Sequence, residues 1–159
     1  MNATRLTTAL LLLAALFAGC AKNIPNTTVS DSDANRRIVD FMESYRTAVS
    51  ERNVAELIKM ASPQYLDDNG SPIGDDDIDY ESLKTKLGRW ADRVQDVRYE
   101  IKYQNVSEKN DHYFVEFRYT ASFRVVQVDG EAKWTRRVGD HRVELIDNGS
   151  GGFWFLSGM

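Results

Sequence analysis

Few side chains in this chain are of the types that carry covalent or proton-transfer chemistry. The 159-residue sequence contains one cysteine, Cys20, and two histidines, His112 and His141. A cysteine can act as a nucleophile, hold a metal or take a lipid, whereas a histidine can exchange protons near neutral pH. Because the sequence holds no second cysteine, it excludes an internal disulfide and dithiol redox chemistry.

Cys20 follows a segment that is typical of a secretory signal peptide. Arg5 precedes an apolar run over residues 9–18, and the small residues Ala18 and Gly19 stand directly before the cysteine. The run is about 10 residues long, whereas a helix that spans a bilayer needs roughly 20. We therefore expect residues 1–19 to be a cleaved signal peptide.

The residues around Cys20, LFAGCA, resemble the lipobox of bacterial lipoproteins, with Phe17 at the position where leucine is usual. The resemblance implies cleavage before Cys20, a diacylglyceryl group on its sulfur and an acyl chain such as palmitate on the new amino terminus. Two or three acyl chains anchor a protein stably, since each buried methylene contributes about 0.8 kcal/mol. Ala21 and Lys22 follow, not the aspartate that retains many such lipoproteins in the inner membrane. The resemblance thus implies a lipoprotein of the bacterial cell envelope, on the outer membrane and facing the periplasm.

A polar segment separates Cys20 from the rest of the chain. Residues 21–32 contain Pro25 and show neither helical nor strand periodicity, which is typical of a flexible linker. We expect residues 20–32 to form the lipidated cysteine and a flexible tether, and residues 33–159 to form one folded domain.

The composition is that of an ordinary globular domain, 42% hydrophobic and 28% charged. With 20 basic and 24 acidic residues, the net charge is −4, and no basic stripe of the kind that nucleic-acid binding requires is present. The sequence therefore indicates no nucleic-acid partner, and we assign it no cofactor and no metal.

The apolar pattern predicts helices first and strands afterwards. Apolar residues at three- and four-residue steps predict helices over residues 33–52, 53–62 and about 78–94. Alternating apolar and polar residues then predict strands over 97–104, 113–125, 132–146 and the final segment FWFLSGM. The expected class is α+β, with three N-terminal helices packed on a curved, four-stranded antiparallel sheet.

The strand over residues 132–146 contains a conflict between its turn and its apolar pattern. Asp129-Gly130 is a strong signal for a two-residue hairpin, but that register places Trp134 inside and the apolar second half of the strand outside. One extra residue would reverse the second half, and Gly139 is the natural position for it. We therefore predict a bulge at Gly139 that turns three side chains inward: His141, Val143 and Leu145.

This order of elements resembles the nuclear transport factor 2-like superfamily. The resemblance rests on three helices before a bent sheet, a long Tyr- and Phe-rich strand and a short aromatic last strand, and it covers about Asp33 to Met159. It implies a cone-shaped sheet that curls around the helices and often encloses a pocket. Members include ketosteroid isomerases and polyketide cyclases as well as binding and dimerisation modules, so the fold by itself does not choose a function.

The side chains expected around such a pocket are mostly aromatic. Aromatic stripes usually form core, and a pocket left open among them would suit a small apolar ligand, lipidic or aromatic. The candidate pocket residues are Tyr45, Trp90, Phe117, Tyr119, Trp134 and His141.

No catalytic residue is assigned. His112 adjoins a predicted turn, and Asp140 cannot orient His141 because neighbouring strand residues face opposite sides. An isomerase-like site would use a tyrosine on the first helix and a nearby aspartate, here Tyr45 and Asp67, but no motif fixes this match. We favour Tyr45 as a core residue with its hydroxyl at the edge.

An acidic loop, residues 67–79, invites a calcium hypothesis. Counting back from Gly70 places Tyr65 at the first ligand position, so the helix–loop–helix calcium pattern fails. We expect a solvated loop whose last aspartates favour the positive N-terminus of the following helix.

The leading hypothesis is a lipid-anchored periplasmic binding or envelope-interaction module without catalysis. One alternative is a small pocket enzyme of the isomerase, cyclase or dehydratase kind, with His141 or an acidic residue as base. The other is a structural homodimer that presents the outer face of the sheet, including Arg118 and Arg124. The expected partners are the membrane through the lipid anchor, a small apolar ligand, and a second copy or an envelope protein.

Overall fold

The computed structural model describes residues 22–70, 76–127 and 130–159. The predicted signal peptide and Cys20 lie outside the described residues and stay predictions. Within the described ranges, no helix is long and apolar enough to cross a membrane.

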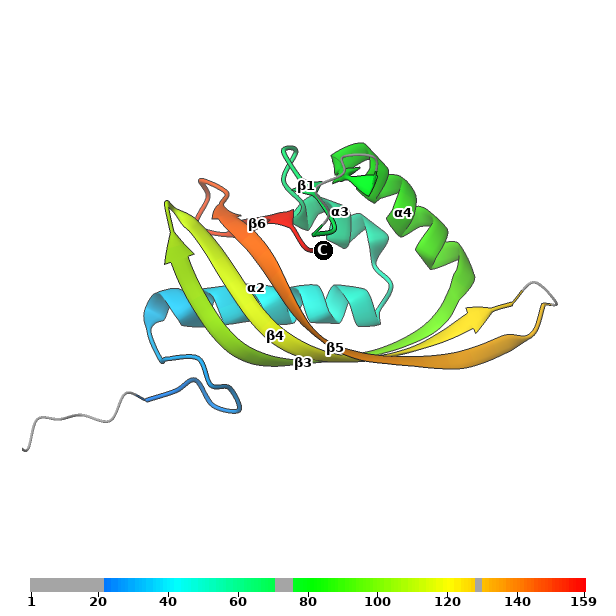
Figure 1. Cartoon of the computed structure of the whole chain (residues 1–159), viewed down its shortest axis with the longest axis horizontal. Coiled ribbons are helices and arrows are strands. Elements are labelled where there is room, and N and C mark those ends of the chain that lie inside the picture. The colour runs from blue at the N-terminus through cyan, green and yellow to red at the C-terminus, as the bar shows by residue number, and fades with distance from the viewer. Residues whose placement is uncertain (1–21, 71–75, 128–129) are drawn as a thin grey trace, which may run out of the picture.

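A strongly bent antiparallel sheet forms one layer of the domain, and three helices cover its concave face (Figure 1). The strands are ordered β3-β4-β5-β6. The pairing of β3 with β4 shifts register after Val94 and after Tyr103, and such bulges bend a strand. The predicted α+β class is confirmed. The strands are β3 (Val94–Lys109), β4 (His112–Val126), β5 (Ala132–Asp147) and β6 (Phe153–Ser157).

The helices begin where the sequence offers a side-chain cap. Ser32, Asn53 and Asp79 each accept a hydrogen bond from the backbone N–H three residues further on. The third helix starts later than predicted because β2 (Ile78–Asp79) first pairs with β1 (Leu66–Asp67). The helices are α2 (Asp33–Ser50), α3 (Val54–Met60) and α4 (Tyr80–Arg93).

The core lies between α2 and the half of the sheet that includes β6. Met42 of α2 and Phe155 of β6 are 0% exposed, and Phe117 of β4 is 1% exposed. Tyr45 packs on Phe155 with ring centroids 4.9 Å apart. Full burial of a large apolar side chain contributes about 1.5–3 kcal/mol to the stability of the fold. The packed half of the cone therefore supplies much of the stability of the domain.

The register of β4 and β5 corrects one prediction. The two strands pair without interruption from His112↔Ile146 to Val126↔Ala132, and Tyr119 faces Gly139 within that ladder. The predicted bulge at Gly139 is therefore wrong.

The extra residue belongs to the turn. The N–H of Gln127 donates to the carbonyl of Glu131 over 2.8 Å, so residues 128–130 connect the strands where the sequence predicts 129–130 alone. Odd-numbered side chains then face inward along all of β5, and Val143 and Leu145 are 1% and 0% exposed. Their inward direction was predicted correctly, but its cause is the loop length.

Gly139 has a different role from the one predicted. A Cβ atom at this position would lie 3.2 Å from Cε1 of Tyr119, which is closer than an ordinary contact. The missing side chain thus leaves room for the Tyr119 ring beside the β5 backbone.

Residues 22–32 are arranged differently from the predicted flexible tether. Asn23 pairs with Ser30 in an antiparallel bridge, and the N–H of Thr28 donates to the carbonyl of Tyr103 over 3.3 Å. Val29 is 2% exposed and belongs to the hydrophobic core. Val29, the partly buried Ile24 and the hydrogen bonds of Thr28 therefore hold this polar segment against the domain.

Candidate functional site

A pocket of about 280 Å³ lies between the helices and the concave face of the sheet. Its wall is mainly apolar and aromatic, and it is contributed by all three helices and by β3, β4 and β5. Its volume lies near the lower end of the range for small-molecule sites. Side chains that define it include Tyr45, Leu83, Leu87, Trp90, Tyr99, Tyr119, Phe123 and His141.

One wall of the pocket is a row of rings that crosses the sheet. The ring centroids of Tyr45 and Tyr99 are 6.2 Å apart, and those of Tyr99 and Tyr119 are 6.1 Å apart. The row ends at His141, whose ring lies edge-on to Tyr119 at 6.3 Å. Edge-on and offset rings are favourable arrangements, so the row is a preformed surface for an apolar or aromatic ligand.

The tyrosines at the base of this row are neutral. Burial raises the pKa of Tyr45 to about 12, and burial, with Tyr45 nearby, raises the pKa of Tyr99 as well. Near neutral pH both side chains therefore keep their hydroxyl hydrogen, and they offer hydrogen bonds without charge.

His141 lies on the pocket wall with one ring nitrogen engaged. Its Nε2 is 2.8 Å from the carbonyl oxygen of Gly158. A carbonyl only accepts, so Nε2 carries a hydrogen and Nδ1 is the nitrogen left for a ligand or a proton.

The aspartate considered for catalysis has a structural task. Asp67 accepts hydrogen bonds from the N–H of Gly158 over 3.0 Å and from the Tyr65 hydroxyl over 3.3 Å. The Tyr65 oxygen in turn accepts from the N–H of Met159 over 3.0 Å. These bonds fix the segment after β6, so Asp67 holds the chain in place and does not line the pocket. Among the described residues, no carboxylate lines the pocket.

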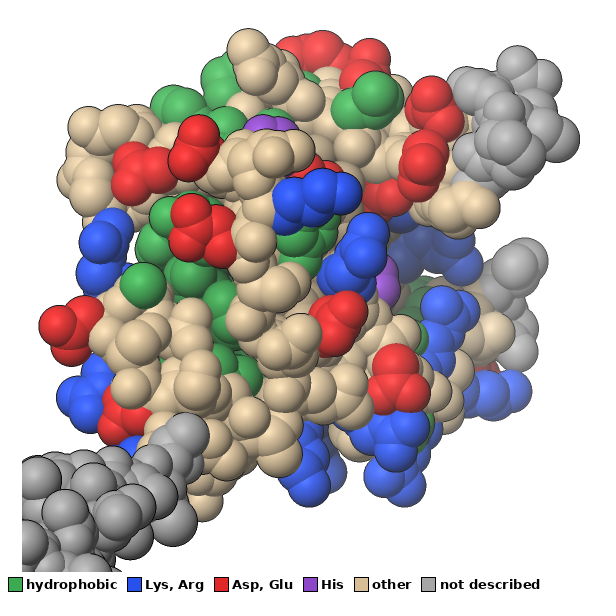
Figure 2. Space-filling model, turned by 60° about the vertical axis from the view of Figure 1, so that its left-hand side comes forward, with side chains coloured by type: hydrophobic (Ala, Val, Ile, Leu, Met, Phe, Trp, Pro, Cys, Tyr) green, Lys and Arg blue, Asp and Glu red, His purple; other side chains and the backbone are tan. Residues whose placement is uncertain are grey.

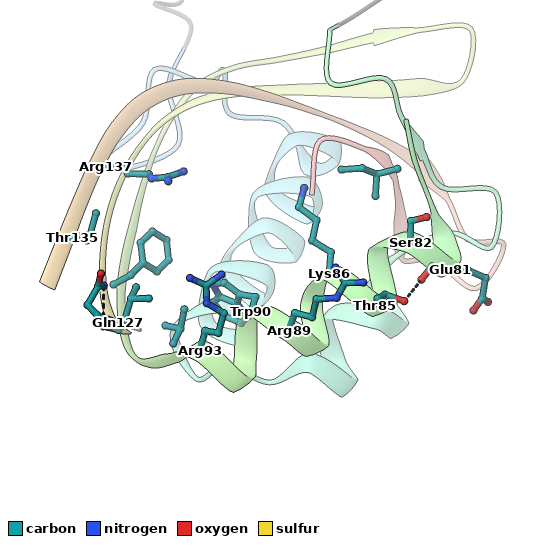
Figure 3. A pocket seen from close by; sticks show the side chains of 14 residues that line it. Glu81, Ser82, Thr85, Lys86, Arg89, Trp90, Arg93, Gln127, Thr135 and Arg137 are labelled. Carbon is teal, nitrogen blue, oxygen red and sulfur yellow. Dashed lines mark hydrogen bonds between the residues drawn. The ribbon is translucent and has the colours of Figure 1, made fainter. Parts of the chain in front are cut away.

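A larger cleft of about 1000 Å³ opens beside the pocket, between α4 and the far ends of β4 and β5. Pocket and cleft share the side chains of Lys86, Trp90, Phe123 and Arg137, so they adjoin. Figure 3 shows Lys86, Arg89 and Arg93 on α4, with Arg137 reaching from β5 into the same space. The mouth of the pocket is therefore basic.

These cations make no ion pair with any other residue that the structure describes. Among the described residues, Glu81 is the one carboxylate that lines the cleft, and it binds Lys84 over 2.8 Å. In Figure 2 the hollow on the right-hand side of the molecule is bordered by Lys and Arg side chains. We call Lys86, Arg89, Arg93 and Arg137 the basic mouth.

The structure brings four of the six candidate pocket residues together. Tyr45, Trp90, Tyr119 and His141 line the pocket. Phe117 lies in the core behind it and packs against His141 at 5.6 Å. Trp134 differs from the expectation, because the register turns it to the outer face, where it is 50% exposed and stacks with Arg98.

The basic mouth is the part that sequence reasoning missed. Arg89 follows Lys86 by three residues, and Arg93 follows Arg89 by four. This spacing places the three side chains along one side of a helix, next to Trp90. Arg137 needs the correct hairpin register before it can be assigned to the inner face. The spacing of the three α4 cations could thus be recognised in the sequence, whereas the inward direction of Arg137 could not.

The remaining chemical candidates lie elsewhere. His112 pairs with Glu144 at the end of the β4–β5 ladder. In the acidic loop, Asp67 and Asp68 accept N–H groups of the next turn, while residues 71–75 lie outside the described ranges. No cluster of three metal-ligating side chains occurs among the described residues.

Comparison with known proteins identifies the fold. No protein-family profile and no curated protein sequence matches the chain. Among solved structures, a ketosteroid isomerase-like protein from Erwinia carotovora is 16% identical with a TM-score of 0.61, over 80% of this chain and 94% of that one. A putative scytalone dehydratase from Novosphingobium aromaticivorans is 14% identical with a TM-score of 0.60, over 78% and 80%.

A third similar structure is named as an association domain and not as an enzyme. It is a putative calcium/calmodulin dependent protein kinase II association domain from Xanthomonas campestris, 12% identical with a TM-score of 0.59, over 88% of this chain and 96% of that one. At such identities the likeness is one of fold. The domain has the cone-shaped, nuclear transport factor 2-like fold.

Proposed function

We propose that the chain is a lipid-anchored periplasmic protein whose cone pocket binds a small, largely apolar ligand without converting it. The observation that carries the proposal is the open aromatic pocket, bounded by Trp90, Tyr99 and Tyr119 and lined by no carboxylate among the described residues. Catalysis by proton transfer usually needs an acid or base with a tuned partner.

The anchoring part of the proposal rests on the lipobox-like residues before Cys20. Mass spectrometry of the amino-terminal peptide from membranes should detect a lipidated Cys20. Cys20→Ala should leave the lipid absent and move the protein to the soluble fraction. A Cys20→Ala protein that still fractionates with membranes would contradict the anchor.

The binding part is tested on a soluble form that begins at Lys22. The neutral apolar fluorophore N-phenyl-1-naphthylamine should become brighter on addition of protein. Leu87→Trp, which adds bulk on the α4 wall of the pocket, should remove this signal, whereas Trp134→Ala on the outer face should leave it unchanged. Equal signals from both variants would argue against binding in the cone.

The enzyme alternative is favoured by one observation, His141 on the pocket wall with Nδ1 unengaged. Similar folds carry the names of an isomerase-like protein and a putative dehydratase. A ligand identified by native mass spectrometry would be incubated with the protein and followed by proton NMR. An unchanged spectrum supports binding alone, whereas a new species that disappears with His141→Asn supports the enzyme.

A homodimer, or a complex with an envelope protein, is the other candidate. Trp134 and Val138, four residues apart on the outer face of β5, are large apolar side chains that are 50% and 56% exposed, and association of two copies through this face would bury them. Light scattering of the soluble form should then give twice the monomer mass, and Trp134→Ser with Val138→Ser should return it to monomer.

A further inference from the structure

We propose that the ligand of the cone pocket is an amphiphilic anion, whose apolar body lies in the pocket and whose carboxylate or phosphate head lies in the basic mouth. This inference rests on the proposed function and adds the chemical class of the ligand. Its basis is the joining of two different surfaces, aromatic inside and cationic outside, at shared residues.

The cations converge from two elements that are distant in sequence. Lys86, Arg89 and Arg93 lie along one side of α4, and Arg137 comes from β5 on the opposite wall of the cleft (Figure 3). Opposed positive groups can contact one anion from two sides, and the planar guanidinium of arginine is suited to the two oxygens of a carboxylate or phosphate.

The basic mouth stands out against the charge of the whole chain, which is −4. Several arginines elsewhere have acidic partners, for example Arg118 with Asp140 and Arg36 with Asp31. In the mouth, the three cations of α4 and Arg137 on the opposite wall have no such partner among the described residues. An anionic ligand would supply the opposite charge that these side chains lack.

Two of the four cations are expected to matter most. Lys86 and Arg137 line both the pocket and the cleft, so they lie where a buried apolar body would end and its head group would begin. Arg89 and Arg93 line only the cleft. All four are solvent-exposed, so their contribution should be modest per residue and should weaken with salt.

The test compares two probes of similar shape. 1-Anilinonaphthalene-8-sulfonate carries a negative sulfonate, and N-phenyl-1-naphthylamine is its neutral counterpart. Binding of each probe is measured with the soluble form, the double variant Lys86→Gln/Arg137→Gln, and the control Lys102→Gln on the outer face of the sheet. Circular dichroism melting checks that the variants fold.

If the inference holds, the double variant weakens the anionic probe by about tenfold, as expected for two exposed charge contacts. The neutral probe should be unaffected, the control should behave as wild type, and 0.5 M salt should weaken only the anionic probe. Equal binding of both probes, with no loss in the double variant, would overturn the anion inference and leave the proposed function standing. Failure of both probes to bind would overturn both.

A second arm separates the two sources of negative charge. Dodecanoate, dodecyl phosphate and neutral dodecanol compete against the bound anionic probe. Displacement by the acid or the phosphate at lower concentration than by dodecanol supports the inference, and the better competitor identifies the head group. Equal displacement by dodecanol would contradict it.

Discussion

The two halves of the sheet are built from the same strands and serve different purposes. Near β6, the inward side chains of β4 and β5 are sealed under α2, and Val115 and Leu145 are 0% exposed. Beyond Gly139 there is no β6 to continue the sheet, α4 borders a cleft, and the inward residues Thr135 and Arg137 are exposed. Inward and outward side chains alternate along the strands in both halves. The elements that cover the sheet, and not the strands, therefore decide which half is core and which is binding surface.

The largest expected effect tests the packed half. Leu145→Ala should lower the free energy of unfolding by about 2–5 kcal/mol, because it leaves a cavity where neighbours cannot collapse. Phe123→Ala removes a larger side chain from the open half, where the ring is only partly buried, and should cost less than Leu145→Ala. Urea denaturation measures both, and equal losses would remove the distinction between the halves.

The next effect concerns Tyr45, at the boundary between the halves. Its pKa is raised from 10.0 to about 12 by burial, so the folded state favours the neutral phenol. This stabilisation is fully present below pH 10 and is lost as the pH rises toward 12, by about 3 kcal/mol.

The measurement is urea denaturation at a series of pH values between 9 and 12. Tyr45→Phe should show a smaller loss of stability over this range than wild type, whereas Tyr113→Phe, which keeps Tyr45, should follow wild type. Identical pH profiles for Tyr45→Phe and wild type would contradict the assignment.

A smaller effect tests how Gly139 shapes the open half. Gly139→Ala places a methyl group about 3.2 Å from the Tyr119 ring, which must then shift. We expect a destabilisation of about 1–2 kcal/mol, as for other overpacked positions, together with weaker binding of the neutral probe. In a Tyr119→Ala background the same substitution should have almost no effect, and a double-mutant cycle measures this difference.

The smallest effect is expected on the outer face. Trp134→Ala removes a large side chain that is half exposed and contacts Arg98. The change in unfolding free energy should lie within about 0.5 kcal/mol, as is usual for surface positions. A loss comparable to that of Leu145→Ala would show that Trp134 belongs to the core after all.

The fold could be predicted from the sequence because its signals are local and repeated. The change of apolar period from 3.6 to 2 separates helices from strands, and the side-chain cap Asn53 marks where the second helix begins. The inward direction of Leu145 could also be predicted, since apolar and polar residues alternate around it in the sequence.

The site could be predicted only in part. It depends on whether the odd- or the even-numbered residues of β5 face inward, and no local signal in the sequence decides this. Asp129-Gly130 suggests one loop length and the structure has another, and one residue decides whether Trp134 or Arg137 faces the pocket. Burial of Val29 was likewise hidden, since the two large apolar residues of this polar segment, Ile24 and Val29, define no period. Such features become visible only when distant segments are brought together.

The arrangement of residues 22–32 has a consequence for orientation at the membrane. Lys22 is already bonded to the domain through the N–H of Asp31, and Cys20 precedes it by two residues, a span of about 7 Å at most. A lipid on Cys20 would therefore hold the domain against the bilayer by this end. Helix α4, which carries three of the four residues of the basic mouth, lies toward the opposite end of the long axis (Figure 1). With a membrane at the lipid-bearing end, α4 and the basic mouth would lie on the side of the domain away from the lipid, and a ligand would enter from that side.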